Sequence, residues 1–133
     1  MRADGVLVLI QPHQWKRPFI AVSASESRQP VTALVNPVFQ PLINAAMAAI
    51  QTVGEQGLFE RIGMSHHQFR VRLASLSELR EYLHLGQRPP RFPPGGRQRL
   101  LDLWRSQPAG ARIEVTESFT VIGLRALGPY AQD

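Results

Sequence analysis

The chain of 133 residues has the length of one domain, and its apolar content of 44% is sufficient for a modest core. It contains no cysteine, which excludes disulfides, thiolate metal sites and a cysteine nucleophile. Without a recognisable signal peptide or an apolar run of roughly 20 residues, a cytoplasmic protein with no membrane contact is expected. The formal net charge is +5, and residues 61–125 contain eleven arginines and five acidic residues.

The first predicted element is a strand, Val6–Ile10, that is apolar at every position. Such a strand normally lies inside a sheet that is covered on both faces. No earlier strand precedes it, so we expect its unpaired edge to associate with another chain. A symmetric homodimer would satisfy that edge, and so would a partner that supplies an N-terminal half.

The segment Gln11–Pro18 is predicted to be a loop, because its two prolines lack the donors that a continuing strand needs. Ligands of open α/β sheets bind outside the carboxyl ends of strands. His13 and Trp15 are therefore the candidate substrate-binding residues. The competing interpretation is a solvated histidine beside a tryptophan that covers the core.

A small hairpin or flap is predicted from the extended segments Phe19–Val22 and Val31–Val35. A long helix should follow, starting at Pro37 or, because Pro41 must lie in the first turn, at Gln40. We expect Gly63 to close this segment. One face of this helix is expected to pack on the core. It is formed by residues that recur at helical spacing, namely Phe39, Ile43, Ala46, Ile50 and Val53.

The second half of the chain alternates short predicted strands and helices. Residues 69–73 alternate in polarity like a strand, and Ser75 with Glu78 forms a capping box before a two-turn helix. After the Pro-rich loop 87–96, an amphipathic helix is predicted at Arg97–Ser106. The strands Ile113–Thr116 and Phe119–Leu124, joined by Glu117-Ser118, are predicted to form a closing hairpin.

In this order of elements the chain resembles the C-terminal part of a class I, Rossmann-like S-adenosylmethionine-dependent methyltransferase. Residues 2–9, Arg-Ala-Asp-Gly-Val-Leu-Val-Leu, are similar to the family's Pro-Gly-Gly-x-Leu-x-Leu entry to the fifth strand. Residues 119–126 resemble its closing strand, and residues 64–110 would be a family-variable helical insertion. The length and the order of elements predict a single α/β domain over 1–127, followed by a loose tail at 128–133.

The resemblance does not extend to the cofactor-binding half of the family. Gly95-Gly96 follows two prolines rather than a strand, so it lacks the context of a nucleotide-binding loop. S-adenosylmethionine is therefore expected only if a partner supplies the missing half. The implied function is an acceptor-side half of a transferase, inactive alone, and no catalytic residue is assigned.

The alternative function is a small basic module without enzymatic activity that binds nucleic acid or an acidic partner. It depends on the aromatic side chain of Phe92 among four arginines, a combination that can stack a base and neutralise phosphates. Pairing of these arginines with nearby acidic residues would instead be structural. The arginines are Arg88, Arg91, Arg97 and Arg99.

The other reactive side chains predict neither a metal site nor a catalytic site. His66 and His67 are adjacent, whereas two ligands on one helix face would be three or four residues apart, so no metal is predicted. Glu114 and Glu117 are three residues apart and would not share one face of a strand, which argues against paired-carboxylate catalysis. The expected fold is therefore α/β: a small mixed sheet of the opening strand and the closing hairpin, one long helix and a helical insertion.

Overall fold

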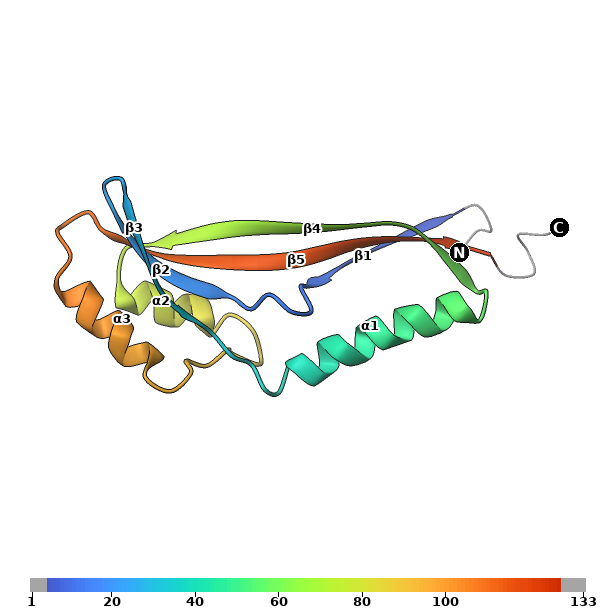
Figure 1. Cartoon of the computed structure of the whole chain (residues 1–133), viewed down its shortest axis with the longest axis horizontal. Coiled ribbons are helices and arrows are strands. Elements are labelled where there is room, and N and C mark those ends of the chain that lie inside the picture. The colour runs from blue at the N-terminus through green and yellow to red at the C-terminus, as the bar shows by residue number, and fades with distance from the viewer. Residues whose placement is uncertain (1–4, 128–133) are drawn as a thin grey trace. The chain divides into compact units, whose positions relative to one another are not determined.

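The computed structural model describes residues 5–127, so the family-like residues 2–4 and the predicted tail at 128–133 lie outside it. Its contacts divide the chain into two compact units, to both of which β4 and β5 contribute. The prediction of a single domain stays a prediction. The described elements are β1 (Val6–Pro12), β2 (Phe19–Ala24), β3 (Ser27–Ala33), α1 (Gln40–Glu55), β4 (Phe59–Leu73), α2 (Leu76–Leu83), α3 (Gly96–Arg105) and β5 (Arg112–Ala126) (Figure 1).

Unit 1 comprises residues 5–15, 40–67 and 118–127. Strand β1 pairs antiparallel with the end of β5, from Val6 opposite Arg125 to Pro12 opposite Phe119. The start of β4 pairs with the end of β5. Next to this pairing, the Leu127 N–H donates a hydrogen bond to the Leu58 carbonyl at 2.9 Å. Both β1 and β4 are therefore antiparallel to β5 and run in the same direction, and the chain between them passes through β2, β3 and α1.

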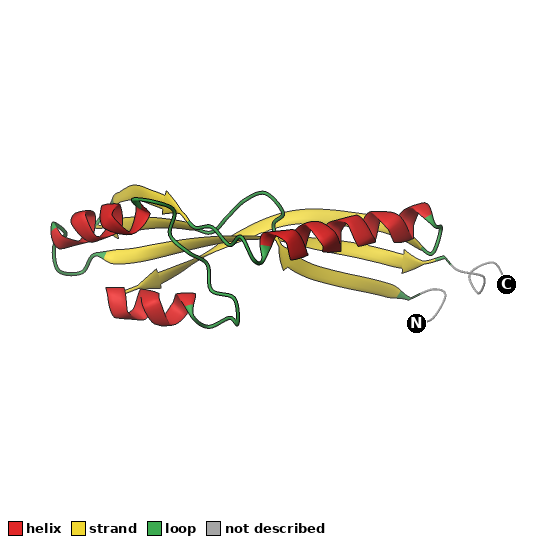
Figure 2. Cartoon of the chain, turned by 90° about the horizontal axis from the view of Figure 1, so that it is seen from below, coloured by secondary structure: helices red, strands yellow, loops and turns green. Residues whose placement is uncertain are grey.

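Helix α1 forms where the sequence predicts it. The Asn36 side chain accepts a hydrogen bond from the Phe39 N–H at 3.0 Å, and regular helix begins at Gln40. The chain leaves the helix through Gly57, whose φ of +73° favours glycine. Figures 1 and 2 show α1 running along the strands of unit 1. Ile43 is the buried residue of this helix.

Unit 2 comprises residues 16–39 and 68–117. The predicted hairpin is confirmed: β2 and β3 pair antiparallel and are joined by a tight turn, in which Ser25 has a φ of 53°. The hairpin extends further into the polar segment than the apolar residues indicate. Strand β2 also pairs antiparallel with the start of β5, from Phe19 opposite Thr116 to Ser23 opposite Arg112.

Two short helices complete unit 2. The capping box is present at α2, because Ser75 Oγ accepts from the Glu78 N–H at 3.1 Å while Glu78 accepts from the Ala74 N–H. Helix α3 begins at Gly96, one residue before the predicted start. These helices cover a core that joins strands from distant parts of the sequence. Its buried residues are Ile20, Val22, Leu34, Leu73, Leu79, Leu83, Leu100, Ile113 and Val115.

The predicted closing hairpin is wrong, because residues 112–126 form one continuous strand. The polar pair Glu117-Ser118 does not turn the chain. Instead, Glu117 accepts a hydrogen bond from the Tyr82 hydroxyl, and the Ser118 carbonyl accepts one from the His13 N–H at 3.0 Å. The backbone can stay extended because each half of β5 has a strand partner of its own. The strand pairs β1–β5, β2–β3 and β2–β5 are all antiparallel, so these strands do not form the mixed sheet that was predicted.

The segment after α1 also differs from its prediction. Gly63 lies inside β4, and the strand expected at 69–73 is only the last third of a strand that starts at Phe59. The predicted insertion at 64–110 therefore starts within a strand. None of the helices in residues 5–127 combines the length and the apolar character that a membrane span requires. The broad assignment to the α/β class is confirmed by the five strands and three helices of the described chain.

Candidate functional sites

A cluster of imidazole rings lies in unit 1 just beyond the carboxyl end of β1. The ring centroids of His13 and His66 are 4.6 Å apart and the planes are tilted by 47°. His66 Nδ1 lies 2.9 Å from the buried hydroxyl of Thr120. His67 stacks on Phe119 with centroids 5.3 Å apart. Antiparallel pairing of β5 with β1 and β4 brings these residues together, and we call them the histidine cluster.

The loop after β1 fixes the orientation of His13. Its Nδ1 accepts a hydrogen bond from the Trp15 N–H at 3.0 Å, so the proton of the neutral ring lies on Nε2. The Trp15 side chain is 72% exposed, which shows that it does not cover the core. The two predicted substrate-binding residues are thus adjacent, and Trp15 positions His13 through its backbone.

An amide network joins this loop to the first turn of α1. Gln40 Nε2 donates to the Gln14 carbonyl at 2.7 Å and to Asn44 Oδ1 at 3.1 Å. The Gln14 side chain donates to the same oxygen of Asn44 at 3.2 Å. The histidine cluster and this network offer neutral hydrogen-bonding groups and imidazoles, which can orient a polar substrate or exchange a proton with it. In residues 5–127 no three His, Cys, Asp or Glu side chains are grouped closely enough to hold a metal ion.

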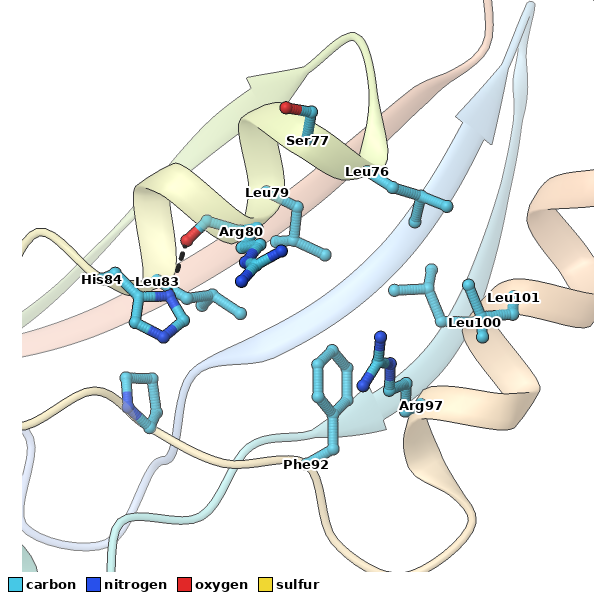
Figure 3. Close-up of a pocket in the computed structure, with 11 residues that line it drawn as sticks. Leu76, Ser77, Leu79, Arg80, Leu83, His84, Phe92, Arg97, Leu100 and Leu101 are labelled. Atoms are coloured by element: carbon cyan, nitrogen blue, oxygen red, sulfur yellow. Dashed lines mark hydrogen bonds between the residues drawn. The ribbon is translucent and has the colours of Figure 1, made fainter.

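A second candidate site is a cleft of about 600 Å³ in unit 2, between α2, α3 and the loop that precedes α3. The buried side chains of Leu79, Leu83 and Leu100 form its floor. Arg80 and Arg97 extend toward the open space from α2 and α3, respectively (Figure 3). We call this space the α2–α3 cleft, and its remaining lining residues are Leu76, Ser77, His84, Pro90, Phe92 and Leu101.

The structure separates the predicted arginine cluster. Arg91 and Arg97 line a shallow hollow with Phe92, but Arg88 lies in a different hollow beside Tyr82. Arg99 donates to the Thr32 hydroxyl at 3.3 Å. Phe92 packs against the core of unit 2, so its ring offers only part of a face for stacking. Three of the five residues, Arg91, Phe92 and Arg97, therefore line one hollow, and the nucleic-acid surface stays a prediction.

The two glutamates that the sequence analysis set aside have structural partners in unit 2. Burial by itself raises the pKa of Glu114, but hydrogen bonds from Arg28 and Ser23 and the charges of Arg28 and Arg72 outweigh it and hold the pKa below its ordinary value. Burial and the neighbouring Glu117 carboxylate raise the pKa of Tyr82 well above its usual range. Glu114 is therefore an ion-pair centre, and Glu117 is a hydrogen-bond acceptor.

The assignment of His13 and Trp15 to a substrate site stays a prediction, and sequence reasoning missed that His66 lies against His13. The adjacency of His66 and His67 was assessed for metal binding on a helix, whereas both residues lie in β4. His66 contacts Thr120 and His67 contacts Phe119 only because β4 pairs with β5, so the sequence alone does not show these contacts. The α2–α3 cleft was also missed, although both helices were predicted. Comparison with known proteins gives no match among family models, curated proteins or solved structures.

Proposed function

We propose that this chain is the acceptor-side half of an S-adenosylmethionine-dependent methyltransferase, completed by a partner chain that pairs with β1. The observation that carries the proposal is β1 itself. It pairs with β5 and runs in the same direction as β4, and its outer edge has no strand partner within residues 5–127. A continuing α/β sheet would begin at this edge.

The side chains of β1 support association at that edge. Val6, Val8 and Ile10 are 51%, 57% and 70% exposed, and the strand contains no charged residue. The other edge strand of unit 1, β4, has Glu60 and Arg61 in exposed positions. Charged side chains protect a sheet edge from further pairing, whereas an uncharged apolar edge invites it. The contrast favours β1 as the docking strand.

The histidine cluster has the position that the proposal requires for the methyl acceptor. Ligands of α/β sheets bind outside the carboxyl ends of strands, and His13 follows β1 directly. Neighbouring strands of doubly wound sheets are mostly parallel. In this chain the strand pairs β1–β5, β2–β3 and β2–β5 are antiparallel. The proposal therefore places the parallel strands, and the Gly-rich cofactor loop, in the partner.

The test is calorimetric titration with S-adenosylmethionine of the chain alone and of the chain mixed with a genomically adjacent product that carries the missing strands. We expect binding only by the mixture, and its loss in Val8→Glu. The control is Leu85→Glu, because Leu85 is 80% exposed and lies outside unit 1. Binding by the isolated chain, or none by the mixture, would contradict the proposal. A β1-dependent homodimer in light scattering would instead identify a second copy as the partner.

The alternative as a basic binding module has one observation in its favour, the hollow in which Arg91 and Arg97 accompany Phe92. Its diagnostic property is the salt dependence of affinity for single-stranded RNA, because neutralised phosphates release counterions. A steep salt slope that decreases in Arg91→Gln would favour this function. An affinity that does not change with salt would exclude it.

A further inference from the structure

We infer that the α2–α3 cleft binds a small apolar molecule that carries one anionic head group. This inference is independent of the proposed methyltransferase function, because every lining residue belongs to unit 2. The volume of about 600 Å³ lies in the range of pockets that enclose small ligands. A molecule of that size would be held between two helices and a proline-rich loop rather than on an open surface.

The apolar part of the ligand follows from the floor and walls of the cleft. Leu79 and Leu83 are supplied by successive turns of α2, and Leu100 faces them from α3. Phe92 and Leu101 are partly buried at the sides. Figure 3 shows these side chains directed into the same space. Removing an aliphatic chain or an aromatic ring from water against these surfaces is favourable by the hydrophobic effect.

The head group follows from the charges at the opening. Arg80 and Arg97 extend toward the cleft from opposite sides, and no acidic side chain lines it (Figure 3). The ion pairs within residues 5–127 use Arg28, Arg72, Arg105 and Arg125, so neither cleft arginine is neutralised by a carboxylate. Two guanidinium groups without an acidic partner favour a carboxylate or phosphate between them.

His84 adds a third polar group at the same opening. Its Nδ1 donates to the Arg80 carbonyl at 2.8 Å, which fixes the ring beside the last turn of α2. In the neutral ring the acceptor nitrogen is then Nε2, which can accept from a hydroxyl on the ligand. The cleft thus joins an apolar interior to an opening with two positive charges, and an amphipathic anion matches both parts.

Calorimetry with dodecanoate, dodecyl phosphate and dodecanol, each below its micellar concentration, tests the inference. We expect either anion, or both, to bind at least tenfold more tightly than the alcohol, because charge-assisted hydrogen bonds are absent for the alcohol. The stronger of the two anions identifies the head group. Equal affinities for the alcohol and both anions, or no binding by any of the three, would overturn the inference.

Matched variants locate the site. Arg97→Gln should weaken binding of the preferred anion by about tenfold or more, and Arg105→Gln on the same helix should not, because Arg105 pairs with Asp102 outside the cleft. Leu101→Trp should block the cleft, whereas Leu85→Trp should not. Circular dichroism identifies any variant that has not folded. Equal affinities of folded Arg97→Gln and Arg105→Gln, with Leu101→Trp still binding, would contradict the assignment.

Discussion

The Nε of Arg28 lies 2.9 Å from Oε2 of Glu114, a contact that ties the β2–β3 hairpin to β5. The Glu114 side chain is only 3% exposed, and its second carboxylate oxygen lies 3.5 Å from Arg72 Nε. A buried charge is tolerated when partners of opposite charge and hydrogen bonds surround it. This cluster of one acid and two arginines therefore makes strand pairing in unit 2 depend on electrostatics as well as on apolar burial.

Replacing the buried acid should destabilise the protein. Glu114→Gln leaves two guanidinium groups facing a neutral amide, and we expect the free energy of unfolding at pH 7 to fall by about 2–3 kcal/mol. Asp102→Asn is the matched control, because Asp102 forms an exposed pair with Arg105 worth less than about 1 kcal/mol. Urea denaturation followed by circular dichroism measures both variants. Similar losses in the two variants would contradict a central role of Glu114.

The same carboxylate predicts a loss of stability in acid. Because its pKa in the folded protein is held below the ordinary value of 4.5, Glu114 stabilises the fold above that value. The stabilisation should disappear as the pH falls from 4.5 through the lowered pKa. Urea midpoints of the wild type and of Glu114→Gln should therefore differ at pH 7 and converge in acid. A difference that does not change with pH would show that the effect is one of packing.

Removal of the Tyr82 hydroxyl should cost less. It donates to Glu117 Oε2 at 3.0 Å, and Tyr82→Phe should lower the free energy of unfolding by about 1–2 kcal/mol at neutral pH. The raised pKa of Tyr82 means that this contribution is complete below pH 10 and is lost as the pH rises further. Thermal unfolding at pH 7 and pH 11 should show the difference between variant and wild type decreasing. An unchanged difference would argue against ionisation of Tyr82 as the cause.

Gly96 should not accept a side chain. A Cβ atom there would lie 2.9 Å from Thr32 Oγ1 and 3.1 Å from Pro93 Cδ, both closer than van der Waals contact. Gly96→Ala should therefore destabilise unit 2 by about 1–3 kcal/mol. Gly86→Ala is the control, because no atom lies within 4 Å of the added carbon. Differential scanning calorimetry of the two variants should give a lowered melting temperature for Gly96→Ala alone.

The sequence by itself determined the three helices and the hairpin, because their signals are local. Asn36 predicts the start of α1, and the capping box predicts the start of α2. The hydrogen-bond partners in these caps are three residues apart, so the interacting groups are visible in a short segment. The apolar character of β1 was equally evident. His13 and Trp15 were assigned from their place after that strand, and the structure keeps them together.

Only the tertiary structure decided the lengths of β4 and β5 and the contents of both candidate sites. Glu117-Ser118 has the composition of a turn, yet distant partners from α2 and the β1 loop keep it extended. His66 and Thr120 are separated by 54 residues and meet through strand pairing. Such pairing depends on long-range hydrogen bonds that no local pattern encodes. The α2–α3 cleft likewise exists because two separately predictable helices pack on one core.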